Sequence, residues 1–243
     1  MKAFVVAEIA SNWEGSISKA KKLILNCKNA DANAVKFQMW RAEDLYKGHT
    51  DWENIKKSEL NFKTTKTLKQ YCDSIGIEFF SSVFYPEAVD FLESLKVKQY
   101  KIASRTSTLN DPYSNETINK IGKTRKPIIV SMGMGGNKRL IKQKIIKNKH
   151  QFCYCISKYP TKLTEIDWKN AIKFDGFSDH TLGTTAPLIF TILHKQKGTK
   201  NIFIEKHVKN KNSKGPDASS SITTEELKEM ILHIRKIEKI KSI

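Results

Sequence analysis

Two histidines in the last third of the sequence each follow an apolar run. His180 lies in the stretch GFSDHTLG, directly after the run that ends at Phe177, and His207 follows the run of residues 202–204. Side chains at the ends of two neighbouring strands of a closed sheet can meet at one divalent ion. Two histidine ligands with open positions are typical of a catalytic rather than a structural metal site. The pair therefore predicts a metal site at His180 and His207, if the two segments are neighbours.

Two lysines fall inside strand-like runs, where burial of an ammonium group without a counter-charge costs several kcal/mol. Lys36 and Lys101 therefore need an anionic partner. Serines that can donate hydrogen bonds to the same anion stand at the ends of other runs: Ser82, Ser104, Ser131 and Ser178. Ammonium and hydroxyl groups together suit a phosphate or a phosphorylated carboxylic acid. The alternative is that the lysines pair with Glu8 or Glu205 and hold no ligand.

Strand alternation assigns further polar side chains to the same faces. Gln38 lies two residues after Lys36 and shares its face. Glu205 and His207 share a face in the same way, which turns Lys206 outward. We therefore expect Gln38 and Glu205 to face the site together with the lysine and histidine groups.

Three connections could also contribute to a site. Asp217 lies in the turn signal KGPD, where its carboxylate can accept hydrogen bonds from sugar hydroxyls. The run SMGMGG, residues 131–136, carries three glycines that allow close approach of a ligand, and it is not a dinucleotide fingerprint. The segment from Arg41 to about Asn61 is either a lid over the site or an ordinary loop with a short helix.

The elements that must position these groups are eight β-favouring runs that alternate with helical segments. The runs cover residues 3–9, 34–39, 78–82, 99–103, 127–131, 151–156, 174–178 and 201–206. The helical segments include residues 18–30, 86–95, 137–149 and 223–240. Eight such units predict a single α/β domain over residues 1–243, a (β/α)8 TIM barrel, with a doubly wound open sheet as the alternative. Functional groups of a barrel collect at the C-terminal ends of its strands, where the residues named above lie.

The chain carries 43 lysines and arginines against 25 acidic residues, a formal charge of +18. Such an excess is compatible with a nucleic-acid partner, an acidic membrane or an anionic substrate. The basic residues are spread through the helical segments of a chain rich in Lys, Ile and Asn, which favours compositional bias over a binding surface. We therefore expect no nucleic-acid partner.

The apolar runs and cysteines bear on the cellular location. No apolar run approaches the roughly 18 residues needed to cross a membrane. Glu8 interrupts the apolar N-terminal stretch, which argues against a signal peptide there. We expect a cytoplasmic protein with no membrane partner, in which the four cysteines are reduced and buried.

Eight motifs in order give a resemblance to a known family. They are AEIASNWEG, AVKFQMWRAEDL, GIEFFSSVF, YKIAS, SMGM, YPT, FSDHTLG and IEKHV with KGPD. Together they closely resemble the barrel domain of the N-acetylneuraminate (sialic acid) synthase family. The resemblance implies a TIM barrel that condenses phosphoenolpyruvate with an N-acetylmannosamine-type sugar. The implied products are a nine-carbon 2-keto-3-deoxy acid and phosphate, and the implied cofactor is Mn2+ or Mg2+.

The resemblance also implies roles for individual residues. It places the metal ligands at His180 and His207 and a catalytic carboxylate at Glu8. The phosphoenolpyruvate contacts fall on Lys36, Ser82, Lys101, Ser104, Ser131, Ser157 and Ser178. The sugar contacts fall on Gln38, Tyr159 and Asp217.

The sequence departs from the family pattern at a few positions. Trp13 stands where the family usually has His, and Arg105 and Thr106 stand where it commonly carries an acidic residue. We also expect the chain to lack the C-terminal antifreeze-like domain with which bacterial relatives reach across a dimer. A homodimer of barrels is compatible with the resemblance.

Two alternatives to a sialic acid synthase stay open. A diacetamido-trideoxyhexose in place of the N-acetylmannosamine-type sugar would give a legionaminic-type acid. A non-catalytic barrel that binds phosphoenolpyruvate or a sugar is the other alternative, because Thr106 replaces the acidic residue. Turnover distinguishes this second alternative from an enzyme.

Overall fold

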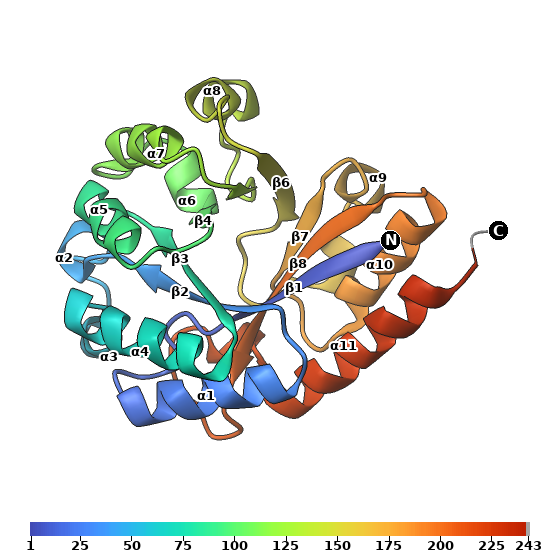
Figure 1. Ribbon diagram of the computed structural model, residues 1–243, viewed down its shortest axis with the longest axis horizontal. Coiled ribbons are helices and arrows are strands. Elements are labelled where there is room, and N and C mark those ends of the chain that lie inside the picture. Colours follow the sequence, from blue (N-terminus) through green and yellow to red (C-terminus); the bar gives the residue numbers. More distant parts are fainter. Residues whose placement is uncertain (242–243) are drawn as a thin grey trace.

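The computed structural model describes residues 1–241 and forms a closed barrel of eight parallel strands surrounded by helices (Figure 1). The strands are β1 (Lys2–Glu8), β2 (Ala34–Met39), β3 (Glu78–Val83), β4 (Tyr100–Ile102), β5 (Ile128–Ser131), β6 (His150–Cys155), β7 (Gly176–Asp179) and β8 (Asn201–Lys209). They follow one another in sequence order, and β1 pairs with β8 along seven residues from Lys2 to Glu8. This closing pair confirms the predicted (β/α)8 TIM barrel and excludes the open sheet.

One principal helix follows each strand. These helices are α1 (Ile17–Asn29), α4 (Phe62–Ile75), α5 (Pro86–Ser94), α7 (Ser114–Lys123), α8 (Lys138–Lys144), α9 (Trp168–Ala171), α10 (Thr185–Gln196) and α11 (Thr224–Lys239). Shorter elements in the connections are α2 (Ala42–Leu45), α3 (Trp52–Lys57), α6 (Ser104–Ser107), 3-10 turns at Leu163–Glu165 and Ala218–Ser220, and the strand β9 (Ile222–Thr223). In the described residues 1–241, none of the helices is long and apolar enough to cross a membrane.

Local sequence signals explain where several helices begin and end. Thr223 and Glu226 form a reciprocal capping box at the start of α11, and Gly76 ends α4 in the left-handed conformation. The predicted helix 137–149 is shorter than expected, because α8 ends at Lys144. Its next residue, Ile145, is buried, and Asn148 donates from Nδ2 to the carbonyl of Lys126 at 2.9 Å. These contacts turn the chain into β6.

The barrel interior changes from apolar to polar along the strands. We define the apolar plug as the inward-facing cluster Val6, Ala34, Phe80, Ile129, Cys153 and Phe203. Two residues further along the same six strands lie Glu8, Lys36, Ser82, Ser131, Cys155 and Glu205. With Lys101 from β4 and Ser178 from β7 they form what we call the polar ring, with one residue from each strand. Because side chains alternate along a strand, this spacing of two points both sets inward.

The outward-facing strand residues pack against the surrounding helices in the main core, which includes Val35 and Phe37. A smaller cluster of Trp40, Ala42, Ile55 and Phe84 fixes the segment 41–61 beside the barrel mouth, with Tyr46 packed on it. The segment carries the short helices α2 and α3. All four cysteines are free and buried, as predicted.

Candidate active site

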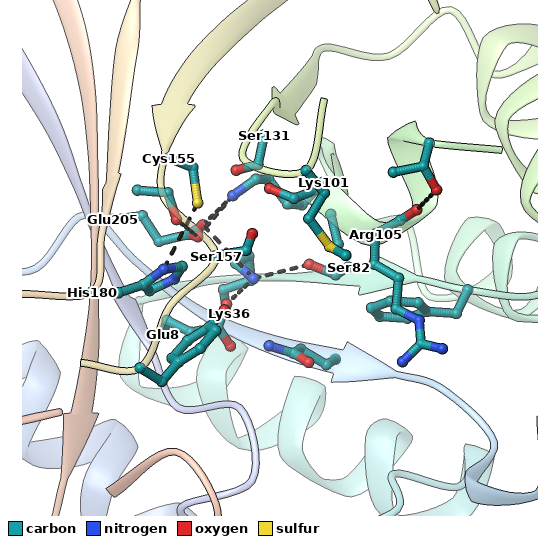
Figure 2. Close-up of a pocket in the computed structure, with 18 of the residues that line it drawn as sticks. Glu8, Lys36, Ser82, Lys101, Arg105, Ser131, Cys155, Ser157, His180 and Glu205 are labelled. Carbon is teal, nitrogen blue, oxygen red and sulfur yellow. Dashed lines mark hydrogen bonds and ion pairs between the residues drawn. The ribbon is translucent and has the colours of Figure 1, made fainter. Parts of the chain in front are cut away.

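A cavity of about 620 Å³ opens at the C-terminal ends of the strands, and all eight residues of the polar ring line it (Figure 2). Thirteen of the fourteen residues that the sequence predicted for the site lie in its wall. They are Glu8, Lys36, Gln38, Ser82, Lys101, Ser104, Ser131, Ser157, Tyr159, Ser178, His180, Glu205 and His207. The structure therefore brings these groups together at the C-terminal face of the barrel, as the sequence predicted.

The exception is Asp217, which lies outside the cavity wall. Its Oδ2 accepts hydrogen bonds from the backbone N–H of Ser11, at 3.1 Å, and from the Ser11 hydroxyl. These bonds tie the β1–α1 connection to the β8–α11 connection. The predicted contact between Asp217 and a sugar stays a prediction.

The lysines and carboxylates of the polar ring form a buried ion-pair network (Figure 2). Lys101 Nζ donates to both carboxylate oxygens of Glu205, at 2.7 and 2.8 Å. Lys36 contacts Glu8, donates to Ser82 Oγ at 2.9 Å and lies 3.7 Å from Glu205 Oε2. The lysines therefore pair with the protein's own carboxylates, as one of the two alternatives from the sequence predicted. An anion that enters the cavity would share these ammonium groups with Glu8 and Glu205.

Burial sets the protonation of this network. It lowers the pKa of Lys36 from 10.5 to about 7, because desolvation and the neighbouring Lys101 outweigh the attraction of Glu205. Burial alone would raise the pKa of Glu205, but Lys101 and Lys36 hold it well below its usual range. Glu205 is therefore ionised near neutral pH, whereas Lys36 is only part protonated. An anionic ligand would favour the charged form of Lys36.

Two serines lie at the edge of the network. Ser131 Oγ is buried and has no hydrogen-bond partner among the described residues. Ser104 Oγ accepts from the backbone N–H of Gly133 at 2.9 Å, and its hydroxyl also interacts with the side chain of Cys155. A buried polar group without a partner is costly, and an oxyanion would satisfy the Ser131 hydroxyl.

The glycines of SMGMGG serve packing within the protein more than approach by a ligand. A Cβ atom on Gly133 would lie 2.8 Å from Ser157 Oγ and 2.9 Å from the carbonyl oxygen of Cys155. A Cβ atom on Gly136 would lie 2.6 Å from the carbonyl oxygen of Ser107. At these two positions the neighbouring loops leave no room for a side chain, and the expected close approach of a ligand to this run stays a prediction.

The two predicted metal ligands meet in the cavity wall. The rings of His180 and His207 have centroids 5.3 Å apart, and the ring of Tyr159 lies 4.1 Å from that of His180. His180 Nδ1 donates to the carbonyl of Ile156 at 2.7 Å. This bond fixes the orientation of the ring and leaves Nε2 as the nitrogen that can accept a ligand. His207 Nδ1 is buried and has no hydrogen-bond partner within residues 1–241. These nitrogens fit a divalent ion.

The pKa values of the two histidines shift in opposite directions. Burial lowers the pKa of His207 to about 3, so its ring is neutral near neutral pH. Burial acts in the same direction on His180, but the interactions with Cys155 and with the carbonyl of Ile156 outweigh it and raise the pKa. Within the described residues, no three or more His, Cys, Asp or Glu side chains are arranged so that they could hold a metal ion by themselves.

Behind the histidines lies an ion pair that the sequence reading missed. Lys206 points out of the barrel, as predicted, but it is fully buried, with Nζ 2.7 Å from Asp179 Oδ2. Asp179 also accepts from the backbone N–H of Thr181 at 2.9 Å. The pair joins β7 to β8 one residue before each histidine. The sequence did contain a signal for this pair. A charged residue directly precedes each histidine, Asp179 before His180 and Lys206 before His207.

The mouth of the cavity holds residues from connections rather than strands. Tyr46, Arg105 and Asp111 line it together with Thr108, Asn110 and Met134. The departures from the family pattern fall in different places. Arg105 faces the cavity, whereas Thr106 and Trp13 are buried outside its wall.

Comparison with known proteins gives the family. The model of the NeuB family matches residues 23–242. This chain belongs to the NeuB family. The resemblance found from the motifs is therefore confirmed, and it extends over nearly the whole chain.

Individual relatives of this NeuB-family chain agree. An uncharacterized protein of Methanocaldococcus jannaschii is 35% identical over 98% of this chain and 71% of its own length. The N,N'-diacetyllegionaminic acid synthase of Legionella pneumophila is 30% identical over 99% of this chain and 73% of its own length. The crystal structure of the spore coat polysaccharide biosynthesis protein spsE from Bacillus subtilis is 28% identical, with a TM-score of 0.77, and the match covers 97% of this chain and 68% of that one. The sialic acid synthetase structure from Leptospira borgpetersenii shares the fold, with a TM-score of 0.84 at 23% identity over 97% of this chain and 84% of that one.

Proposed function

We propose that this NeuB-family barrel condenses phosphoenolpyruvate with an N-acylated amino sugar, which yields a nine-carbon 2-keto-3-deoxy acid and phosphate. The observation that carries the proposal is the polar ring. One residue from each of eight strands converges on a single cavity that also holds two histidines. Relatives bear the names of synthases of this class, including pseudaminic acid synthase of Campylobacter jejuni, 31% identical over 98% of this chain, and N-acetylneuraminate-9-phosphate synthase of mouse, 28% identical over 97%.

The anionic groups of phosphoenolpyruvate match the polar ring. Its phosphate and carboxylate would take the ammonium groups of Lys36 and Lys101, which now bind Glu8 and Glu205. The hydroxyls of Ser104 and Ser131 would donate to the same oxygens, because both residues line the cavity and Ser131 Oγ has no partner among the described residues. Ser82 and Ser157 are further donors in the same wall, and Ser178 donates to Glu205 Oε1 at 2.8 Å. Binding would then give the buried Ser131 hydroxyl a partner.

His180 and His207 would hold Mn2+ or Mg2+, because both residues line the cavity and their ring centroids lie 5.3 Å apart. When bound, the ion would polarise the aldehyde oxygen of the open-chain sugar as a Lewis acid. The side chains of Gln38 and Tyr159 lie in the same wall, where they would position the sugar. Tyr159 also covers the face of His180 and so limits the access of water to it.

The reaction that this arrangement favours forms one C–C bond and one C–O bond from water, and it breaks the C–O bond to the phosphate. The two protons of the water end on the former aldehyde oxygen and on the departing phosphate. The enol carbon of phosphoenolpyruvate attacks the aldehyde carbon, which leaves a cation at the carbon that bears the phosphate. Water adds to that carbon, and phosphate then departs to leave the keto group. We assign the proton of this water to Glu8, whose Oε1 is oriented by the backbone N–H of Ala10 at 2.9 Å. Lys36 beside Glu8 stabilises the resulting phosphate charge.

The test is phosphate release from phosphoenolpyruvate with Mn2+ across a panel of N-acylated hexosamines. The panel includes a diacetamido-trideoxyhexose, because the relatives from Legionella and Campylobacter named as diacetyllegionaminic acid synthases are 30% and 32% identical. We expect sugar-dependent release that is lost in the double variant His180→Ala, His207→Ala. Binding of phosphoenolpyruvate without release under any condition would reject the synthase and leave the non-catalytic barrel.

A further inference from the structure

The cavity wall is formally neutral, although the whole protein carries a charge of +18. Three cationic side chains line it: Lys36, Lys101 and Arg105. Three anionic side chains balance them: Glu8, Glu205 and Asp111. Phosphoenolpyruvate alone would bring more negative charge than the two deep lysines offset, so among the Lys and Arg side chains of the wall Arg105 is the one left for a second substrate.

Arg105 is already paired at the mouth of the cavity. Its Nε donates to Asp111 Oδ2 at 2.6 Å, and its guanidinium lies 5.4 Å from the centre of the Tyr46 ring. Tyr46 is fixed in turn by an edge contact with Trp40, with ring centroids 5.3 Å apart. The pair is partly shielded from water, since the side chains of Arg105 and Asp111 are 35% and 15% exposed. The mouth therefore presents a fixed, neutral ion pair.

Such a pair favours an uncharged ligand over an anionic one. A phosphate group at the mouth would face the carboxylate of Asp111, and like charges at close range in a shielded site repel by more than in water. Hydroxyl and acyl groups need no net charge, and the guanidinium keeps donors other than its Nε–H for them. Thr108 and Asn110 beside the pair add neutral polar groups to the same wall.

We propose that the Arg105–Asp111 pair selects an unphosphorylated amino sugar as the acceptor and discriminates against the same sugar bearing a terminal phosphate. This inference rests on the proposed function and specifies its second substrate. Asp111 acts as the discriminating residue, because it cancels the one cation that a sugar phosphate would use.

The test compares kcat/KM for an N-acylated hexosamine and its 6-phosphate, with saturating phosphoenolpyruvate and Mn2+. We expect wild type to prefer the unphosphorylated sugar by about 100-fold. Asp111→Asn leaves the charge of Arg105 uncancelled, and we expect the preference to fall by about tenfold, the effect of one unfavourable charge contact of about 1.4 kcal/mol. Asp73→Asn is the matched control, because it removes the same charge at the Lys69 ion pair on α4, away from the cavity. We expect Asp73→Asn and wild type to have the same ratio of kcat/KM for the two sugars.

Arg105→Gln gives a second readout. We expect the KM for the unphosphorylated sugar to rise by about tenfold, whereas the KM for phosphoenolpyruvate stays unchanged. A purely structural role for Arg105 would instead raise both KM values or lower the melting temperature. Equal use of both sugars by wild type, or an unchanged preference in Asp111→Asn, would overturn the proposal.

Failure of the inference is distinct from failure of the proposed function. If no sugar supports turnover, the synthase function fails. Calorimetric titration of the two sugars into the protein, with phosphoenolpyruvate and Mn2+ present, then supplies the same comparison from affinities. Stronger binding of the unphosphorylated sugar, reduced in Asp111→Asn, would still support the discrimination, and equal affinities would reject it.

Discussion

The apolar plug and the polar ring lie two residues apart on the same strands, yet they have opposite chemistry. Phe80 in the plug and Ser82 in the ring are equally buried, at 0% and 1% exposure. Burial of the plug stabilises the barrel, because it removes apolar surface from water. Burial of the ring costs stability, because it desolvates two ammonium and two carboxylate groups. The plug thus contributes to the stability of the barrel, whereas the ring residues are suited to binding a ligand.

Two residues of the polar ring show the cost of burying polar groups. The pKa of Lys36 is lowered to about 7, and Ser131 Oγ is buried without a partner among residues 1–241. The plug has no unpartnered buried nitrogen or oxygen side-chain atom, because its members are all apolar or thiol side chains, and its one shifted pKa is that of Cys153, which burial raises. Perturbed pKa values and unpartnered polar groups that share one cavity mark a functional site.

The largest expected effect concerns the plug. Phe80→Ala should lower the free energy of unfolding by about 3–5 kcal/mol, because it leaves a cavity among tightly packed side chains. The folded fraction should still bind phosphoenolpyruvate with wild-type affinity. Ser82→Ala, on the same strand, should change the free energy of unfolding little but weaken the binding of phosphoenolpyruvate. Denaturant unfolding and calorimetric titration measure the two quantities, and similar effects of both variants on stability would remove the distinction between plug and ring.

The next effect concerns the histidines above the ring. His207→Ala should weaken Mn2+ binding by about 100-fold, because a direct ligand contributes at least as much as its supporting groups. The melting temperature should change little, since the neutral ring makes no hydrogen bond at Nδ1 to the described residues. Titration followed by electron paramagnetic resonance gives the affinity. His150→Ala, which changes a histidine at the start of β6 outside the cavity wall, is the control. Equal Mn2+ binding in the two variants would reject the metal site.

The protonation of Lys36 predicts a pH dependence of binding. The free protein loses the proton of Lys36 near pH 7, and an anionic ligand binds the protonated form, so binding takes up a proton at higher pH. The Kd for phosphoenolpyruvate should therefore rise by up to about tenfold per pH unit between about pH 7 and 9. Lys36→Arg should flatten this profile, because arginine stays charged throughout. A flat profile in wild type would show that burial does not lower the pKa of Lys36.

The smallest expected effect separates hydroxyls inside and outside the ring. Ser131→Ala should weaken phosphoenolpyruvate binding by about fivefold, equivalent to about 1 kcal/mol, the contribution of one hydrogen bond. It should leave stability equal or slightly higher, because it removes an unpartnered buried hydroxyl. Ser81→Ala is the matched control, since Ser81 Oγ is buried but donates to the carbonyl of Phe37 at 3.0 Å. The control should lose stability and keep its affinity, and the opposite pattern would contradict the assignment.

The sequence predicted the deep part of the site, except for Cys155, because two simple rules coincide there. Strand alternation placed Lys36 and Gln38 on one face, and the rule that functional groups follow barrel strands joined them to Ser131, His180 and His207. Each of these residues lies in or directly after a strand, where the backbone leaves little freedom. The sequence therefore contained nearly all the information about the deep part of the site.

The mouth could not be predicted in the same way. Tyr46, Arg105 and Asp111 belong to connections whose path depends on packing against Trp40 and Phe84, and no periodicity relates them. The end of α8 was missed for a similar reason, because a buried Ile145 stopped a helix that its neighbours would have continued. A cytoplasmic location and a homodimer stay predictions.

The most direct test follows carbon atoms through the proposed reaction. Wild-type protein with Mn2+ is supplied with phosphoenolpyruvate labelled with 13C at its methylene carbon and with an unphosphorylated N-acylated hexosamine labelled at its aldehyde carbon. We predict a product whose NMR spectrum shows one-bond coupling between the two labels, formed in step with released phosphate. Phosphate and pyruvate without that coupling, or no product at all across the sugar panel, would contradict the assignment of the polar ring to a carbon–carbon bond-forming synthase.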